Sequence, residues 1–198
     1  MKLILLALLG YGIGGIPTGI WLCRAVKGED PRDSGSGTSG ATNVSRVLGK
    51  KWAALVLVAD ALKGYLPVRF LAPAIIEPSQ LALASAVLAV CLVAGHVWTP
   101  YAGFRGGKGV ATAAGAMAAL NGLALLIALG IWVIVFLIAH IVSLASIVAA
   151  ISLPFIILLL PRHSHAIAYA ALLLAMIIIF THRANIKRLE RGEEKRLF

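Results

Sequence analysis

Between Val110 and Leu160 the chain has no Asp, Glu, Lys or Arg, and this stretch limits the possible folds more than any other feature. As a single α-helix it would be ~75 Å long, far more than the ~30 Å hydrocarbon core of a bilayer. It must therefore fold back on itself within an apolar medium. The composition agrees, since 60% of the 198 residues are hydrophobic and the mean hydropathy is +0.94. We expect one all-α integral membrane domain over residues 1–198.

The apolar runs predict seven transmembrane helices, at about 3–25, 52–76, 81–97 and 165–181, with three more between 110 and 160. Breaks near Asn121-Gly122 and His140–Ser143 separate those three. The first of them has only ~12–14 residues, so a broken or tilted helix is the alternative there. The N-terminus begins like a signal peptide, but no A-x-A cleavage site follows, so a retained first span is expected.

Basic side chains gather in the loop at 27–51 and in the tail after His182, which by the positive-inside rule both face the cytoplasm. The loop at 98–109 then lies on the same side, with the N-terminus outside and the C-terminus inside. The net charge of +10 reflects this bias and attraction to anionic lipid headgroups rather than nucleic-acid binding. We therefore expect the polar segments to lie on the cytoplasmic side of the membrane.

Within the spans, several side chains have structural interpretations. Gly10, Gly12, Gly14, Gly15 and Gly19 leave a thin first helix that neighbours can approach, and Pro17 should kink it. Asp60 and Lys63 lie three residues apart and are expected to neutralise each other as a structural pair. His163 and His165 share an outer turn, but no further ligand is nearby, so no metal site is expected.

The first polar segment, residues 33–46, is rich in glycine and hydroxyl groups and ends in Arg46. Glycines let backbone N–H groups turn toward a ligand, and Arg46 offers a bidentate fork for phosphate. The candidate binding residues are Gly35, Ser36, Gly37, Thr38, Ser39, Gly40, Thr42, Asn43 and Arg46. The spacing formally matches a dinucleotide fingerprint, which we reject because no strand precedes it. A flexible Gly/Ser linker is the alternative.

The second polar segment, residues 95–112, places a glycine-rich turn with a lysine directly before an apolar helix. A helix N-terminus presents free N–H groups and a positive dipole, which suit a phosphate. The candidates are His96, Gly106, Gly107, Lys108, Gly109 and Thr112. The segment is no Walker A motif, because Ala102 and Gly109 stand where that motif needs Gly and Ser or Thr. A helix cap with an interfacial lysine is the alternative.

The third polar segment, residues 181–194, begins where the last span leaves the membrane. His182 and Asn185 are three residues apart and share one helical face. Ser143, at the break between two spans, could reach the same site. A basic stop-transfer tail is the alternative interpretation.

Two cationic glycine loops at one interface of a membrane protein suggest two phosphate-bearing ligands, at least one of them a lipid. An enzyme that joins a lipid donor to a phosphorylated acceptor fits this pattern. A carrier of phosphorylated metabolites is the rival, although its site would lie nearer the bilayer midplane.

The three segments, taken together, resemble those of the bacterial acyl-phosphate-dependent glycerol-3-phosphate acyltransferases, the PlsY-type membrane enzymes. The residues that carry the resemblance are Gly35-Ser36-Gly37-Thr38-Ser39-Gly40-Ala41-Thr42-Asn43-x-x-Arg46, Gly95-His96 with Phe104-x-Gly106-Gly107-Lys108-Gly109-Val110-Ala111-Thr112, and His182-x-x-Asn185-Ile186-x-Arg188-Leu189-x-x-Gly192-x-Glu194. They occur in the family's order, and Thr38 is the one departure, where Asn is more usual. The other large acyltransferase class uses His-x4-Asp, which no histidine of this chain satisfies.

The resemblance implies transfer of a fatty acyl group from acyl phosphate to the 1-hydroxyl of glycerol 3-phosphate, giving lysophosphatidic acid and inorganic phosphate. In that family this reaction is the first acylation of phospholipid synthesis, and the resemblance implies a bacterial inner membrane as the location, with the site on its cytoplasmic side. It further implies that Lys108 and the amides of Gly106, Gly107 and Gly109 hold glycerol 3-phosphate, and that Ser36 and Arg46 hold the donor. His182 and Asn185 would orient the hydroxyl or the oxyanion, with either His182 or a substrate phosphate as the base.

The remaining expectations concern the tail and the partners. Glu194 should tie down the tail through an ion pair, with Arg188 also structural. No metal, nucleotide, coenzyme A or obligate protein partner is expected beside the two substrates and the membrane lipids.

Overall fold

The computed structural model describes residues 1–161 and 164–196, and in these ranges every regular element is helical. The α-helices are α1 (Lys2–Gly15), α2 (Thr18–Lys27), α3 (Ala41–Leu48), α4 (Lys50–Leu66), α5 (Ala72–Ile75), α6 (Leu81–Val97), α7 (Val110–Leu120), α8 (Gly122–Ala139), α9 (Val142–Leu159), α10 (His165–Thr181) and α11 (Arg183–Glu190). Three 3₁₀ turns, η1 (Pro31–Asp33), η3 (Pro78–Gln80) and η4 (Pro100–Ala102), and a π-helical turn, η2 (Pro67–Leu71), complete the described elements.

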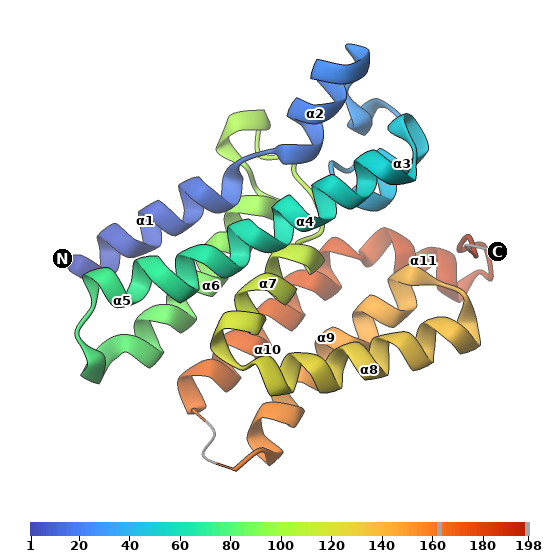
Figure 1. Cartoon of the computed structure of the whole chain (residues 1–198). Helices are drawn as coiled ribbons and strands as arrows, with labels where there is room; N and C mark the ends of the chain where they lie inside the picture. Colours follow the sequence, from blue (N-terminus) through green and yellow to red (C-terminus); the bar gives the residue numbers. More distant parts are fainter. Residues whose placement is uncertain (162–163, 197–198) are drawn as a thin grey trace.

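The helices form one bundle in which α6, α7 and α10 are central (Figure 1). Helix α1 packs against α6, α4 against α7, and α8 against α9, while α10 contacts both α6 and α9. The short helices α2, α3 and α11 gather at one end of the bundle, and the N-terminus lies at the other (Figure 1). The polar loops of the sequence are thus brought to a common end.

Glycines permit the closest helix contacts. A Cβ on Gly14 would lie 2.0 Å from the carbonyl oxygen of Leu92, and one on Gly95 would lie 2.1 Å from that of Tyr11. Gly64 and Gly115 are similarly constrained between α4 and α7. The predicted close approach of neighbours to the first helix is confirmed, since backbones meet where a side chain would not fit.

The predicted helix breaks are confirmed as well. The first span is interrupted at Ile16-Pro17, between α1 and α2, because Pro17 lacks the N–H that would continue the helix. Asn121 ends α7 and caps α8, its side chain accepting a hydrogen bond of 3.0 Å from the N–H of Ala124. His140 has a φ of +59° between α8 and α9. The long apolar stretch therefore makes three helices, of which α7 is the shortest.

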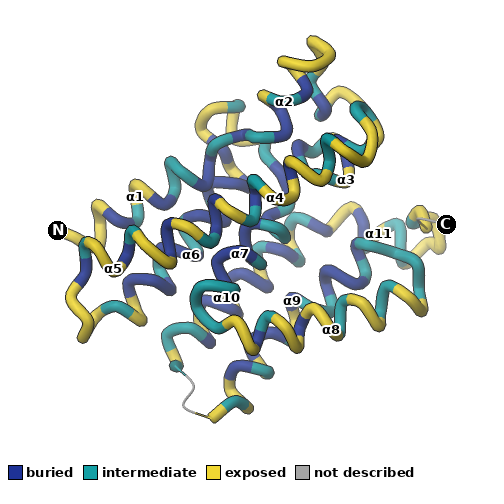
Figure 2. Tube along the Cα trace, viewed as in Figure 1, coloured by how far each residue is buried: buried dark blue, intermediate teal, exposed yellow. Residues whose placement is uncertain are grey.

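Exposed residues lie along the outside of the bundle (Figure 2), and many of them have large apolar side chains. Leu159 and Ile138, for example, are 85% and 78% exposed, as expected for side chains that face lipid. By length and composition, four described helical segments can cross a membrane, and five if α10 and α11, bent by 61°, form one span. The protein is an all-helical membrane protein. Seven crossings and the orientation of the termini stay predictions, and His163 lies outside the described residues.

Candidate active site

Three segments meet at the end of the bundle that carries α2, α3 and α11. We name them loop A (residues 28–40), loop B (residues 98–109) and the C-terminal segment (residues 182–196). Loop A contacts loop B through Ser39, whose N–H lies 3.4 Å from the carbonyl oxygen of Gly106. Loop B contacts the C-terminal segment through Lys108, whose Nζ lies 2.6 Å from Oδ1 of Asn185. The three polar segments predicted to form one site are indeed brought together.

Loop A is organised around the side chain of Asn43, which is 1% exposed. Its amide donates to the carbonyl oxygens of Pro31, Ser34 and Thr38, and its Oδ1 accepts from the N–H of Ser36 at 3.0 Å. These contacts engage both ends of the amide, so any contact of Asn43 with substrate stays a prediction. The residue shapes the loop, as an Asx side chain does when it replaces backbone partners in a turn.

Two glycines of loop A are required by its path. Gly35 and Gly37 have φ values of +63° and +66°, a region that other residues avoid. A Cβ on Gly35 would also lie 2.2 Å from Oδ1 of Asn43. The loop is thus a defined structure rather than the flexible linker that the sequence left open.

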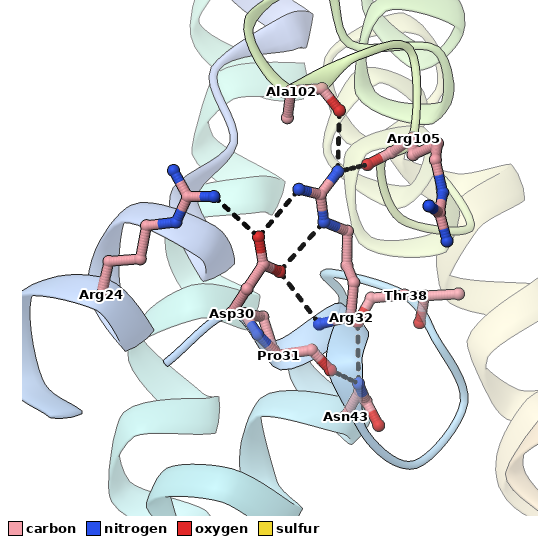
Figure 3. A network of polar contacts seen from close by, with 8 residues as sticks. All are labelled: Arg24, Asp30, Pro31, Arg32, Thr38, Asn43, Ala102 and Arg105. Atoms are coloured by element: carbon pink, nitrogen blue, oxygen red, sulfur yellow. Dashed lines mark hydrogen bonds and ion pairs between the residues drawn. The ribbon is translucent and has the colours of Figure 1, made fainter. Parts of the chain in front are cut away.

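Arg32 joins loop A to loop B, as Figure 3 shows. Its Nη1 donates to the carbonyl oxygens of Ala102 at 2.7 Å and Arg105 at 2.9 Å. Asp30 holds the guanidinium from the other side, and hydrogen bonds from Arg32 and Arg24 lower the pKa of its carboxyl to about 2. Sequence reasoning missed both residues. The signal was Asp30-Pro31, an N-cap followed by proline at the first position of a turn.

Loop B uses two of its glycine amides internally. The N–H of Gly106 donates to the carbonyl of Val97 at 2.9 Å, and that of Gly107 donates to the carbonyl of His96 at 3.2 Å. This corrects the expectation that both amides hold phosphate, since neither N–H is free in this geometry. A Cβ on Gly106 would lie 1.9 Å from the carbonyl oxygen of His96. Both glycines therefore allow loop B to pack closely on the end of α6.

Three other predicted binding residues are buried beneath the loops. His96 is 7% exposed and Ser39 4% exposed. Thr112 is fully buried, and its hydroxyl has no hydrogen-bond partner among the described residues. In this structure the loops cover these three side chains, and their contact with a substrate stays a prediction.

Lys108, near the end of loop B, contacts the C-terminal segment. Its Nζ donates to Asn185, and its carbonyl oxygen accepts a hydrogen bond of 3.0 Å from the hydroxyl of Thr181. Burial lowers the pKa of the ammonium to about 8, with the charges of Arg188 and Arg46 acting in the same direction and that of Glu194 opposing them. A partly desolvated ammonium that is paired only with the neutral amide of Asn185 would bind an anion more strongly than it binds that amide.

Glu194 anchors the C-terminal segment. Its Oε1 accepts from Ser143 at 2.7 Å and from Asn185, and its Oε2 accepts from Arg188 at 2.6 Å. Burial alone would raise the pKa of this carboxyl, but the three hydrogen bonds outweigh it and the pKa lies below its usual value. Glu194 forms an ion pair that ties down the tail, as predicted, and Arg188 is its partner. The hydroxyl of Ser143 serves this anchor, which does not support its predicted contact with substrate.

His182 occupies the bend between α10 and α11, outside the helix of the last predicted span, and is 3% exposed. Its Nδ1 lies 2.8 Å from the carbonyl oxygen of Ile178. Because a carbonyl only accepts hydrogen bonds, Nδ1 carries the proton, and Nε2 of the neutral ring keeps a lone pair. Burial and the charge of Lys108 lower the pKa of His182 to about 4, so the ring is neutral near pH 7.

The polar side chains that remain accessible lie on loop A and α3. Ser36, Thr42 and Arg46 are exposed, and Gly40 and Thr38 are half-buried. The hydroxyls of Ser36 and Thr38 lie 3.0 Å apart, and Nη1 of Arg46 lies 3.4 Å from Oδ1 of Asn43.

The positive charge of the site gathers around Lys108. The next residue, Gly109, has a φ of +85° and is the N-cap of α7. The charges of Arg46, Arg188 and Glu194 all act on Lys108, and three cations against one carboxylate leave the site with an excess of positive charge.

A narrow apolar cavity of about 70 Å³ starts next to this site, between α7, α8, α9 and α10. Val110 and Ile178 line its near end, two residues after Lys108 and one helical turn before His182. Farther along it is lined by Met117, Ala128, Trp132, Ala150 and Leu153. The arrangement offers a place for an apolar chain attached to a group held at the loops.

Within the described ranges, no group of three or more His, Cys, Asp or Glu side chains could hold a metal ion. The chemistry that these residues themselves support is the binding of anions by Arg46 and Lys108, with a neutral imidazole beside them.

Comparison with known proteins identifies relatives over nearly the whole chain. Residues 4–192 match the family model described as glycerol-3-phosphate acyltransferase. A curated glycerol-3-phosphate acyltransferase of Clostridioides difficile (strain 630) is 39% identical over 196 residues, covering 98% of this chain and 95% of that protein. One of Geotalea daltonii is 41% identical over 191 residues, covering 96% and 95% of the two chains.

Two solved structures share the fold. A crystal structure of PlsY (YgiH), described as an integral membrane glycerol 3-phosphate acyltransferase in its glycerol 3-phosphate form, aligns with a TM-score of 0.91 and 35% identity. The lysophosphatidic acid form of PlsY aligns with a TM-score of 0.88 and 33% identity. Each alignment covers 100% of this chain and 96% of the other.

Proposed function

The chain belongs to the glycerol-3-phosphate acyltransferase family and is an acyltransferase, and from this premise we propose that it transfers a fatty acyl group from acyl phosphate to the 1-hydroxyl of glycerol 3-phosphate. The products are 1-acylglycerol 3-phosphate and inorganic phosphate. Family membership removes the metabolite carrier that the sequence left as a rival. The proposed site faces the cytoplasm from a bacterial inner membrane, where the basic loops would favour it.

One observation carries this proposal: cations from the other two polar segments lie near enough to Lys108 to act on its charge, and an apolar cavity begins two residues after this lysine. Arg46 comes with loop A and α3, Lys108 from loop B and Arg188 from the C-terminal segment. Two phosphate-bearing substrates need more positive charge than one, and an acyl substrate needs an apolar chain site next to its phosphate. Both requirements are met within a few residues of Lys108.

We assign glycerol 3-phosphate to Lys108, assisted by the N-terminus of α7 at Gly109. Asn185 now accepts from the lysine, and a substrate phosphate would take over that hydrogen bond. Ser36 and Arg46, which are exposed on loop A and α3, hold the phosphate of the donor. This division gives each phosphate a charge-assisted donor of its own.

The transfer needs no covalent enzyme intermediate, because phosphate is already a good leaving group. The acceptor hydroxyl attacks the carbonyl carbon, the bond from that carbon to the phosphate oxygen breaks, and the hydroxyl proton leaves. His182 accepts the hydrogen bond of the hydroxyl at Nε2 and orients it. With a pKa of about 4 the imidazole is a weaker base than a phosphate, whose second pKa is about 6. The departing phosphate therefore receives the proton.

The apolar cavity beside Lys108 is the proposed site of the acyl chain, and Ala128→Leu tests it. The larger side chain fills space on the α8 side of the cavity, so kcat/KM for palmitoyl phosphate should fall about tenfold relative to that for octanoyl phosphate. Ala139→Leu, at the end of the same helix and outside the cavity lining, is the matched control. An equal loss for both chain lengths would place the acyl chain elsewhere.

Activity should depend on pH through Lys108. The ammonium is charged below its pKa of about 8, whereas the substrate phosphate is fully ionised well above its second pKa of about 6. As pH rises from 7 to 9.5, kcat/KM for glycerol 3-phosphate should fall, approaching about tenfold per unit above pH 8. The Lys108→Met variant should lack this limb, and the same decline in that variant would assign it to another group.

Donor identity is tested by supplying palmitoyl phosphate, palmitoyl-CoA and palmitoyl-acyl carrier protein separately to the purified protein with glycerol 3-phosphate. Formation of lysophosphatidic acid from palmitoyl phosphate alone supports the proposal. Comparable product from either of the other donors would contradict it, while leaving the membership of the family unaffected.

A further inference from the structure

A cluster of buried charges lies beneath the active-site loops, among the helices. Asp60 and Lys63, on α4, are 2% and 9% exposed, and Nζ of Lys63 lies 2.8 Å from Oδ1 of Asp60. The ion pair predicted from their spacing is thus present. Charged side chains at such depth are costly, and proteins keep few of them in membrane helices without a role. The mechanism above uses neither residue.

The same ion pair forms hydrogen bonds to the residues at the break between α1 and α2. The hydroxyl of Thr18 donates to Oδ1 of Asp60 at 2.6 Å, and Nζ of Lys63 donates to the carbonyl oxygen of Ile16 at 2.8 Å. At the next residue after Thr18, a Cβ on Gly19 would lie 2.0 Å from the carbonyl oxygen of Ser39. The break that the pair fixes therefore supports the base of loop A.

On its other side the ion pair faces His96, at the end of α6. Nδ1 of His96 lies 3.7 Å from Oδ1 of Asp60, a distance of electrostatic contact rather than of a hydrogen bond. Nε2 of the same ring would lie 2.2 Å from a Cβ on Gly107, and the carbonyl of His96 accepts the N–H of Gly107. The imidazole thus fills the space between Asp60 and the residue that precedes Lys108.

We propose that Asp60, Lys63 and His96 form a positioning network that holds loop B, and with it Lys108, at a fixed place beside loop A. The network touches α1, α2, α4, α6 and loop B, whereas a pair serving only to cancel charge would need no contact with either loop. A buried ion pair also adds little stability compared with apolar residues of the same size. The inference rests on the proposed function, because it concerns the lysine assigned to glycerol 3-phosphate.

The test compares the wild type with Asp60→Leu/Lys63→Leu, which removes both charges together and leaves neither one buried alone. We expect a thermal unfolding midpoint in detergent within a few degrees of the wild type. The KM for glycerol 3-phosphate should rise about 10- to 100-fold, since small displacements of a binding group have effects of this size. The KM for acyl phosphate should rise less, because the network reaches loop A only through the break between α1 and α2, whereas His96 contacts Gly107 of loop B directly. Ser85→Ala, which removes a buried polar group of α6 far from loop B, is the matched control.

A folded double variant with wild-type kinetics would overturn the proposal, as would an equal rise of both KM values. If the double variant does not fold, His96→Leu decides, because it leaves the ion pair intact and removes the ring that contacts Gly107. That variant should show the same selective rise in KM, and wild-type kinetics would again overturn the proposal. Absence of lysophosphatidic acid from the wild type would instead contradict the proposed function.

Discussion

Lys108→Met should lower kcat/KM for glycerol 3-phosphate by about 100- to 1,000-fold, mainly through KM. Methionine keeps the length and the apolar stem of lysine but cannot pair with a phosphate. The lost interaction is strong because the ammonium is largely desolvated, as its lowered pKa of about 8 reflects. Initial rates of lysophosphatidic acid formation, with each substrate varied in turn, measure the effect.

Lys51→Met is the control for Lys108→Met, since it removes an exposed lysine at the start of α4 and should leave both KM values unchanged. An effect of Lys108→Met on the KM for acyl phosphate alone would reverse the assignment of the two phosphates. Unchanged kinetics for both substrates would exclude Lys108 from the binding of either one.

His182→Ala should lower kcat by about 100-fold with little change in either KM. In the proposed complex the imidazole meets the acceptor hydroxyl through Nε2, since its Nδ1 is engaged with the carbonyl of Ile178. Its loss therefore affects the orientation of the attacking oxygen more than the binding of the phosphates. Single-turnover rates at saturating substrates separate this effect from substrate affinity.

His182→Asn separates the two ring nitrogens. An asparagine amide can replace the Nδ1 donor to Ile178 but has no counterpart of Nε2 at the same reach. We expect this variant to be as slow as His182→Ala. Full turnover of His182→Asn would reduce the role of His182 to that of a helix contact, and full turnover of His182→Ala would exclude it from catalysis.

Much of the fold follows from one-dimensional patterns. Pro17, Asn121 and His140 mark real helix ends, because proline and capping residues act locally. The glycines at 14 and 95 mark close helix approaches for a similarly simple reason, namely the absence of a Cβ. The packing of α10 between α6 and α9 could not be predicted, because it depends on which apolar faces match, and uniformly apolar helices have no distinctive face.

The site was predicted as a set of segments more accurately than as a set of contacts. Lys108 and Asn185 meet as their motifs suggest. Asn43, His96 and Ser143 also lie in or near motifs, but they contact the protein itself, as parts of the support for the loops. A sequence motif indicates which residues a site requires. It does not distinguish the residues that contact a ligand from the residues that stabilise the loops around it. Asp30-Pro31 marks the turn that holds Arg32, but the contacts of Arg32 with loop B could not be predicted, because they are made to backbone carbonyls, which every residue has.

The central claim is direct transfer between two substrates bound together, and phosphate release with the acceptor left out tests it most directly. Purified protein in detergent or lipidic mesophase is mixed with palmitoyl phosphate, and inorganic phosphate is followed before and after glycerol 3-phosphate is added. The account predicts no release without glycerol 3-phosphate, then one phosphate for each lysophosphatidic acid formed. A burst of phosphate equal to the amount of protein, before any acceptor is added, would reveal a covalent acyl-enzyme and contradict it.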